Sequence, residues 1–280
     1  MGASDCVTKP QQSGNVDATR APIRSDLIPK VKELCRKRVP LPAVVASRPA
    51  SPVLPTKRIG LPDRVDIVAI GASTGGRNAL GELLPGLHKD FTVPIVLVQH
   101  MPPLFTRLLA DRLNKQAAVE VHEGGEADVL APGHVWIAPG DFHMKLLREG
   151  SSVRLTMNQA PPQNSCRPSV DVLFESVAEI FGSHSLGVVL TGMGSDGLRG
   201  AECIREAGGQ VIVQDELSSV VWGMPGAVAT AGLAEGIYPL HEIAEELHRR
   251  TDRLALLANS RSFCESGRDS AGHPYPSVIE

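Results

Sequence analysis

The chain has 280 residues, of which 42% are hydrophobic and 21% charged, and its formal net charge is −3. This balance lacks the strongly basic surface typical of nucleic-acid binding, and no apolar run reaches the roughly 20 residues needed to span a bilayer. We therefore expect no nucleic-acid partner and no direct membrane insertion. The five cysteines are scattered without C-x-x-C spacing, which indicates reduced, buried residues in a cytoplasmic protein.

Four stretches differ in composition along the chain. Residues 1–36 contain the segment GASDCVTKP and then a short helical pattern, and residues 37–63 combine prolines with basic residues in the manner of a linker. Residues 64–257 have the texture of a packed domain. Residues 258–280 are polar, and we expect them to be a disordered tail.

Within the domain, short apolar strands alternate with amphipathic helices. Strands are expected at VDIVAIG, PIVLVQH, LGVVLTG and GQVIVQD, and helical spacing of apolar residues follows each of the first three. Strands that are apolar throughout are covered on both faces, as in a parallel sheet. The stretch 134–156 instead predicts short antiparallel strands with a turn at residues 150–152. The fold class is therefore α/β, a doubly wound, mostly parallel sheet with flanking helices and a small antiparallel hairpin insertion.

The first expected strand ends in a glycine-rich turn, IGASTGG. A nucleotide-binding turn would need G-x-G-x-x-G spacing and an acidic residue after the second strand, which ends in His100 instead. No P-loop pattern is present either. The segment GASTG fits the G-x-S-x-G turn that presents a nucleophilic serine, here Ser73. The alternative is that Ser73 only caps the helix that follows.

A serine nucleophile needs a base, usually a histidine oriented by a carboxylate. His100 directly follows the second strand, and Asp196 lies in the glycine-rich loop after the third. The carboxyl ends of parallel strands meet at one edge of the sheet, so Ser73, His100 and Asp196 are expected there together. Asp196 could alternatively be an ordinary turn or cap residue. The chain order Ser, His, Asp differs from that of the usual α/β-hydrolases and indicates a separate family.

Five motifs together resemble the catalytic domain of the chemotaxis protein-glutamate methylesterases: IGASTGG, VLVQHMP, PSVDVLFES, LTGMGSDGLRGA and VVWGMPGAV. The resemblance covers roughly residues 65–255, in the family's order. It implies a triad of Ser73 as nucleophile, His100 as base and Asp196 as orienting acid, with no metal and no cofactor. Thr74, Gly75 and Met193 would be active-site neighbours, and the amides after Ser73 are suitable oxyanion donors.

The substrate implied by this resemblance is a glutamate methyl ester on the cytoplasmic helices of methyl-accepting chemotaxis receptors. The same acyl-enzyme chemistry would permit deamidation of receptor glutamines. The alternative function is a catalytically silent module that docks on receptors. All three triad residue types are present, which argues against that alternative.

The beginning of the chain resembles a different module. The segment GASDCVTKP is similar to the last strand of a response-regulator receiver domain, which would make residues 1–36 a remnant consisting of that strand and the final helix. The phosphate-accepting aspartate has no counterpart, so we expect an esterase that ignores phosphodonors. The alternatives are a start inside a longer chain and a chance match.

Overall fold

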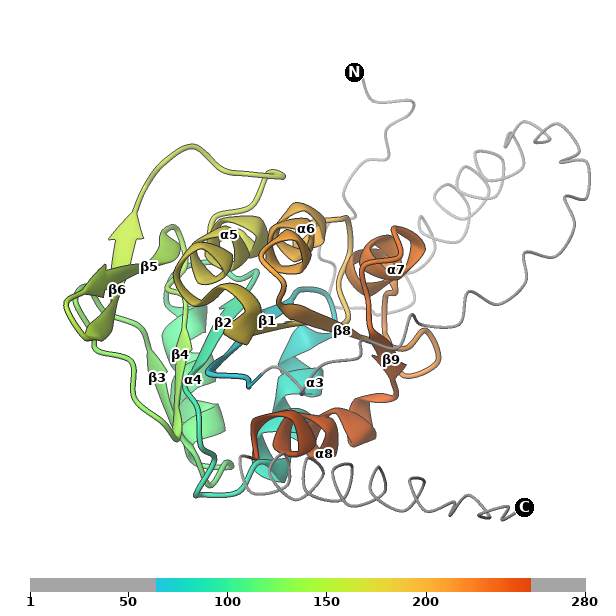
Figure 1. The fold of residues 1–280 in the computed structure, drawn as a ribbon, viewed down its shortest axis with the longest axis horizontal. Helices are drawn as coiled ribbons and strands as arrows, with labels where there is room; N and C mark the ends of the chain where they lie inside the picture. Colours follow the sequence, from blue (N-terminus) through green and yellow to red (C-terminus); the bar gives the residue numbers. More distant parts are fainter. Residues whose placement is uncertain (1–63, 253–280) are drawn as a thin grey trace, which may run out of the picture. The chain divides into compact units, whose positions relative to one another are not determined.

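The computed structural model describes residues 64–252 (Figure 1). The expected receiver remnant, the linker and the tail lie outside these residues. A parallel seven-stranded sheet forms the centre, in the order β3-β4-β2-β1-β7-β8-β9, and a separate antiparallel pair, β5-β6, lies beside it. The strands of the large sheet are β1 (Ile67–Ala72), β2 (Ile95–Gln99), β3 (Glu120–Glu123), β4 (His134–Ile137), β7 (Ser185–Val189), β8 (Gln210–Gln214) and β9 (Gly236–Tyr238).

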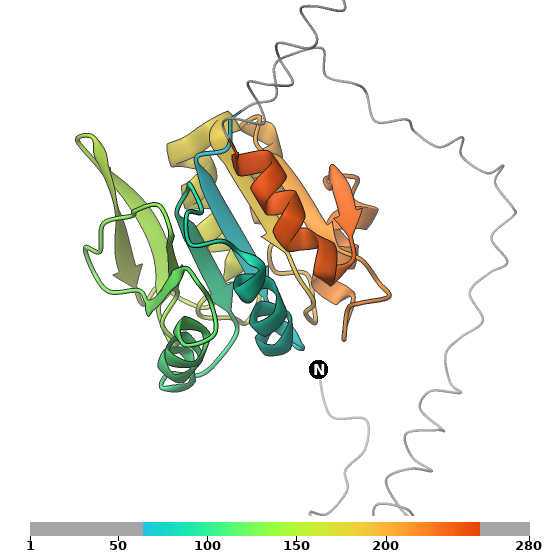
Figure 2. The same cartoon turned by 90° about the horizontal axis from the view of Figure 1, so that it is seen from below.

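Helices cover both faces of this sheet (Figure 2). One face packs against α3 (Gly76–Leu83), α4 (Phe105–Asn114) and α8 (Leu240–Thr251), with the short 3-10 turn η2 (Leu84–Gly86) after α3. The other packs against α5 (Val170–Phe181), α6 (Leu198–Glu206) and α7 (Gly223–Thr230), with the turn η3 (Gly182–His184) after α5. The doubly wound α/β fold is therefore confirmed. Within residues 64–252, no helix has the length and apolar character needed to cross a membrane.

Uniformly apolar strands produce this arrangement. All residues of β1 and β2 are buried, because alternate side chains enter the cores on opposite faces of the sheet. Helix α3 contributes Leu80 and Leu83 to one of these cores at helical spacing. The predicted strands, and the helices expected after the first three of them, are confirmed to within a few residues.

The strand order reverses at the centre of the sheet. On one side of β1 lie β2, β4 and β3, whereas β7, β8 and β9 lie on the other side. Loops leave the carboxyl ends of β1 and β7 in opposite directions, which opens a crevice where such folds bind ligands. The residues after β2, β1 and β7 therefore converge at one edge.

The expected antiparallel stretch is only partly correct. Residues 143–158 form the hairpin of β5 (His143–Glu149) and β6 (Ser152–Asn158), with Gly150 in the turn at φ +61°. Residues 134–137 are instead β4, which pairs in parallel with β2 and β3. An apolar run such as HVWI has the same pattern in either kind of strand, and its partners are distant in the sequence, so local spacing could not reveal the pairing.

Candidate active site

Ser73 directly follows β1 and is fixed by its backbone. Its N–H donates to the Thr191 carbonyl at 3.0 Å, and its own carbonyl accepts from the Gln99 side-chain amide at 2.9 Å and from the Gly76 N–H at 2.9 Å. These contacts tie the turn to the ends of β2 and β7. Helix α3 has no side-chain cap bond, so Ser73 is not the helix cap that the alternative interpretation required.

Two glycines make this turn possible. Gly75 has φ +87°, a left-handed conformation that side chains disfavour. A Cβ on Gly76 would lie 2.1 Å from Gln99 Oε1 and 2.8 Å from the Ala72 Cβ. Gly75 therefore permits the left-handed backbone of the turn, and Gly76 leaves room for the close approach of the Gln99 side chain.

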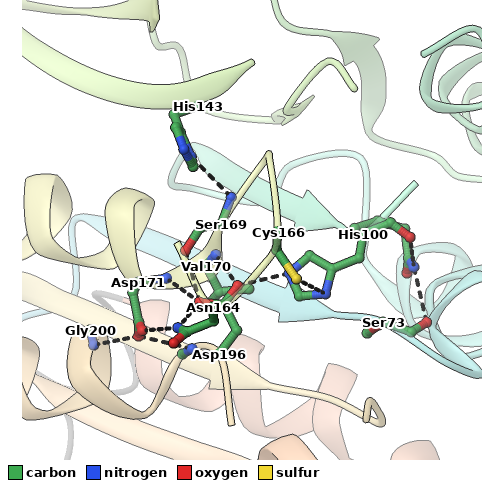
Figure 3. A network of polar contacts seen from close by, with 12 residues as sticks. Ser73, His100, His143, Asn164, Cys166, Ser169, Val170, Asp171, Asp196 and Gly200 are labelled. Carbon is green, nitrogen blue, oxygen red and sulfur yellow. Dashed lines mark hydrogen bonds and ion pairs between the residues drawn. The ribbon is translucent and has the colours of Figure 1, made fainter. Parts of the chain in front are cut away.

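His100 and Asp196 are joined by a hydrogen bond. His100 Nε2 lies 2.8 Å from Asp196 Oδ2, and their side chains are 13% and 3% exposed. The two residues are 96 positions apart in the sequence, and parallel strands bring them together (Figure 3). The predicted pairing of the base with its carboxylate is present in this geometry.

Asp196 is held by further donors at the start of α5. Its Oδ1 accepts from the Ser169 hydroxyl at 2.8 Å and from the Asn164 amide at 3.0 Å. The N–H groups of Val170 and Asp171 also donate to it, at 2.7 and 3.2 Å. Asp196 therefore caps a helix, but that helix is α5 rather than α6, the one that follows it in sequence.

These contacts shift both pKa values of the pair. Burial alone would raise the pKa of Asp196, but hydrogen bonds from His100, the Val170 N–H and their neighbours lower it to about 2. Burial alone would lower the pKa of His100, but hydrogen bonds to Asp196 and Cys166 raise it to about 9. In this arrangement His100 is protonated at neutral pH, and it acts as a base only after losing that proton.

Cys166 is a site residue that sequence reasoning missed. Its thiol lies 3.6 Å from His100 Nδ1, and the residue is half-buried rather than an inert part of the core. Cys166, His100 and Asp196 each bring one potential metal ligand atom within 4.8 Å of the others. The only signal in the sequence was the position of Cys166 two residues before PSVDVLFES.

Ser73 and His100 are not hydrogen-bonded to each other in this structure. Within residues 64–252, no hydrogen bond connects the Ser73 hydroxyl to the imidazole, whose ring points toward Asp196 and Cys166 (Figure 3). A Ser–His bond therefore requires a side-chain movement, and such bonds often tighten only when substrate is bound. The side chains nevertheless lie at the ends of the adjacent strands β1 and β2.

Suitable oxyanion donors lie beside the serine. The N–H groups of Thr74 and Gly75 donate to no acceptor within residues 64–252, and neither does that of Met193 on the facing loop. The Met193 side chain is 73% exposed, so it borders the site rather than filling it. Gly192 brings this loop close to Ser73, since a Cβ there would lie 2.9 Å from the Ser73 Cβ.

A cleft of about 500 Å³ opens over these residues. Its volume lies within the range of ordinary ligand pockets. It is lined by Ser73, Thr74, Gly75, Arg77, Asn78, Gln99, His100, Met101, Pro102, Phe105 and Val220. Asp196 lies behind His100, outside this lining, as an orienting carboxylate would.

In this parallel α/β sheet, Ser, His and Asp residues follow three adjacent strands. That arrangement places the chain in the class of proteins built like serine hydrolases. A model of the CheB methylesterase family matches residues 68–247. The chain therefore belongs to the CheB methylesterase family.

Individual relatives agree with this assignment. The chain is 52% identical over 251 residues to a protein-glutamate methylesterase/protein-glutamine glutaminase of Trichodesmium erythraeum, covering 89% of this chain and 71% of the relative. It is 46% identical over 263 residues to a protein of the same name from Nocardioides, covering 90% and 69%. The crystal structure of the Thermotoga maritima CheB methylesterase catalytic domain superposes with a TM-score of 0.65 at 43% identity, covering 65% of this chain and 97% of that one.

Proposed function

We propose that this chain is a protein-glutamate methylesterase. Its substrates are glutamate methyl esters on the cytoplasmic helices of methyl-accepting chemotaxis receptors, and the same site deamidates receptor glutamines. The names of the relatives support both reactions, and they do not favour a silent docking module. The single observation that carries the proposal is the His100–Asp196 pair at the strand ends beside Ser73.

In the proposed mechanism, the Ser73 oxygen forms a bond to the ester carbonyl carbon while its proton passes to His100. Because Nε2 is bonded to Asp196, the accepting nitrogen is Nδ1. The tetrahedral oxyanion accepts hydrogen bonds from the amides beside Ser73. Its collapse breaks the bond to the methoxy oxygen, which takes the proton from His100 and leaves as methanol.

Water then repeats the sequence on the acyl-enzyme. His100 removes one proton from the water, the new bond forms at the carbonyl carbon, and the Ser73 oxygen departs with that proton. The product is a glutamate carboxylate. With glutamine as substrate, the first leaving group is ammonia instead of methanol.

The thiol of Cys166 is a competing nucleophile, because it lies within hydrogen-bond distance of His100 Nδ1, at 3.6 Å. Two features favour Ser73 for this role. It lines the cleft, whereas Cys166 is not among the lining residues, and it lies beside the unpaired amides of Thr74 and Gly75. We place the enzyme in the cytoplasm, where the free thiols of Cys166 and Cys203 stay reduced.

The test is methanol release from methylated receptor membranes by the full chain and three variants. We expect Ser73→Ala to lose nearly all release, and Cys166→Ser to retain measurable release. Ser195→Ala is the matched control, because Ser195 is an exposed serine on the loop that carries Asp196. Release that survives in folded Ser73→Ala and disappears in Cys166→Ser would reassign the nucleophile. No release by any folded form would overturn the proposed activity.

A further inference from the structure

A second cluster of metal-binding side chains lies at the far edge of the sheet. Glu120 and His122 are two residues apart on the edge strand β3, so their side chains are on the same face. His134 begins the neighbouring strand β4 and pairs directly with Glu120 in the parallel register. The three side chains therefore meet on one face, and none of them lines the cleft described above.

The distances within this cluster match a metal coordination shell. His122 Nε2 lies 3.2 Å from His134 Nδ1, and Glu120 Oε2 lies 3.6 Å from the former nitrogen and 3.8 Å from the latter. Tetrahedral zinc with bonds of about 2.0–2.1 Å would separate its ligand atoms by roughly 3.3 Å. Binding thus needs inward shifts of only a few tenths of an ångström.

The two imidazoles contact each other and a neighbouring aromatic ring. Their rings stack with centroids 5.4 Å apart, and the His134 ring stacks in turn on Trp136 at 5.5 Å. Trp136 is 4% exposed, so it provides a fixed surface beneath the histidines. For both nitrogens to coordinate a cation, each ring must carry its proton on the other nitrogen, which is Nδ1 in His122 and Nε2 in His134.

The chemistry of the donors selects the ion. Two imidazole nitrogens and one carboxylate oxygen suit zinc and its divalent transition-metal neighbours, whereas magnesium and calcium prefer oxygen ligands alone. The side chains of Glu120, His122 and His134 are 67%, 42% and 31% exposed, so an ion can reach them from solvent. Three protein ligands leave one tetrahedral position open for water.

We propose that Glu120, His122 and His134 form a binding site for one divalent transition-metal ion, with zinc as the reference ion. The ion would join the edge strand β3 to β4 through side chains, in addition to their backbone pairing. It would therefore stabilise the outermost strand of the sheet. This site is separate from the proposed esterase chemistry and does not depend on it.

The test is isothermal titration of the full chain with zinc chloride at neutral pH. A Cys166→Ser background removes the thiol of the His100–Cys166–Asp196 cluster, which is the other candidate set of ligands within residues 64–252. In this background we expect binding of one ion at the edge site. His122→Gln and His134→Gln should each weaken it by more than about tenfold, since even residues behind a metal ligand contribute 10–100-fold.

His241→Gln is the matched control, because His241 is an exposed histidine that also lies near a glutamate, at 3.7 Å from Glu242. The zinc affinity of this variant should equal that of the parent, which is the chain with Cys166→Ser alone. Hydrogen exchange adds a readout on the strand itself, because zinc should slow exchange of the β3 amides in the parent and not in His122→Gln. Equal zinc affinity in the parent and both edge variants, or no zinc binding to the folded parent, would overturn the proposal.

Discussion

Asp171 and Asp196 form reciprocal helix caps. Asp196 caps α5, which carries Asp171, and Asp171 caps α6, which follows Asp196. Asp196, just before α6, accepts from the first amides of α5, whereas Asp171, in the first turn of α5, accepts from Gly197 and Gly200 at 2.9 and 2.8 Å. The Asn164 amide contacts both carboxylates, at 2.7 Å from Asp171 and 3.0 Å from Asp196. The reciprocal caps therefore set the position of the carboxylate that holds His100.

Replacing Asp171 should disturb both stability and the site. Asp171→Ala leaves the buried Gly197 and Gly200 amides without their acceptor and removes one of the two acceptors of the Asn164 amide, which we expect to cost about 2–4 kcal/mol of unfolding free energy. Because Asp196 then loses its fixed surroundings, methanol release should also fall. Urea unfolding and methanol release, measured on the same preparation, check the two effects.

Asp128→Ala is the control for this prediction. Asp128 likewise accepts a backbone bond, from the Gly125 N–H at 2.8 Å, but it is not among the residues that line the cleft. The Asp128→Ala variant should lose about 1 kcal/mol of unfolding free energy and keep its rate of methanol release. If Asp171→Ala matched Asp128→Ala in methanol release, the reciprocal caps would not position Asp196.

The proton equilibrium of His100 gives a prediction for pH dependence. Its pKa of about 9 lies above the ordinary 6.5, and only the neutral ring accepts the Ser73 proton. Methanol release should therefore rise with pH up to about 9. An NMR titration of the His100 ring should show the same midpoint in the free enzyme.

Asp196→Asn should lower that midpoint, because the hydrogen bond to the anionic carboxylate raises the pKa of His100. It should also reduce turnover on the order of ten-thousandfold, since the imidazole loses the partner that fixes its tautomer. Equal midpoints in the variant and the parent chain would show that Asp196 does not set the charge of His100.

The same pair contributes to stability in a defined pH range. The pKa of His100 is raised on folding, so its contribution is fully present below pH 6.5 and is lost as the pH rises through about 9. The pKa of Asp196 is lowered, so its contribution is present above about 3.8 and is lost as the pH falls through about 2. Unfolding free energies of the parent and His100→Gln should thus converge toward pH 9.

Cys166 should make the enzyme sensitive to alkylation. A carboxamidomethyl group on its thiol would fill the space beside His100 Nδ1, 3.6 Å away, and block proton transfer from Ser73. We expect iodoacetamide to inhibit the parent chain strongly and Cys166→Ser hardly at all. Cys203→Ser retains Cys166, so it should be inhibited like the parent. Inhibition of Cys166→Ser to the same extent would place the sensitive thiol elsewhere.

Much of the site was predictable because its residues follow apolar strands. Ser73, His100 and Asp196 each lie shortly after a run of buried aliphatic residues, and parallel strands bring such ends together. That argument needs only strand order and direction. The fold class followed from the same alternation of apolar strands and amphipathic helices.

The remaining features depend on contacts that local patterns do not encode. Strand β3, with the sequence EVHE, is a short edge strand with one fully buried side chain, so it carries little apolar signal. Cys166 and Asn164 reach the site from an irregular loop before α5, in which Asn164 has φ +50°. No periodicity predicts such a loop, and its role appears only when α5 and α6 pack together.

The two glycines of α3 offer a matched test of the serine turn. Gly76→Ala would place a Cβ against Gln99 Oε1 and the Ala72 Cβ, so either the helix start or Gln99 must move. We expect a loss of about 1–3 kcal/mol, typical of overpacking, together with reduced methanol release. The rate should fall because Gln99 holds the Ser73 carbonyl.

Gly81→Ala changes the same helix at a position with room. The nearest atom to its Cβ would be an Arg112 side-chain nitrogen at 3.7 Å, which is ordinary contact. Alanine there should add about 0.5–1 kcal/mol through its higher helix propensity and leave methanol release unchanged. Thermal unfolding and methanol release would compare the pair. If Gly76→Ala behaved like Gly81→Ala, the close approach of Gln99 would not be what holds Ser73 in place.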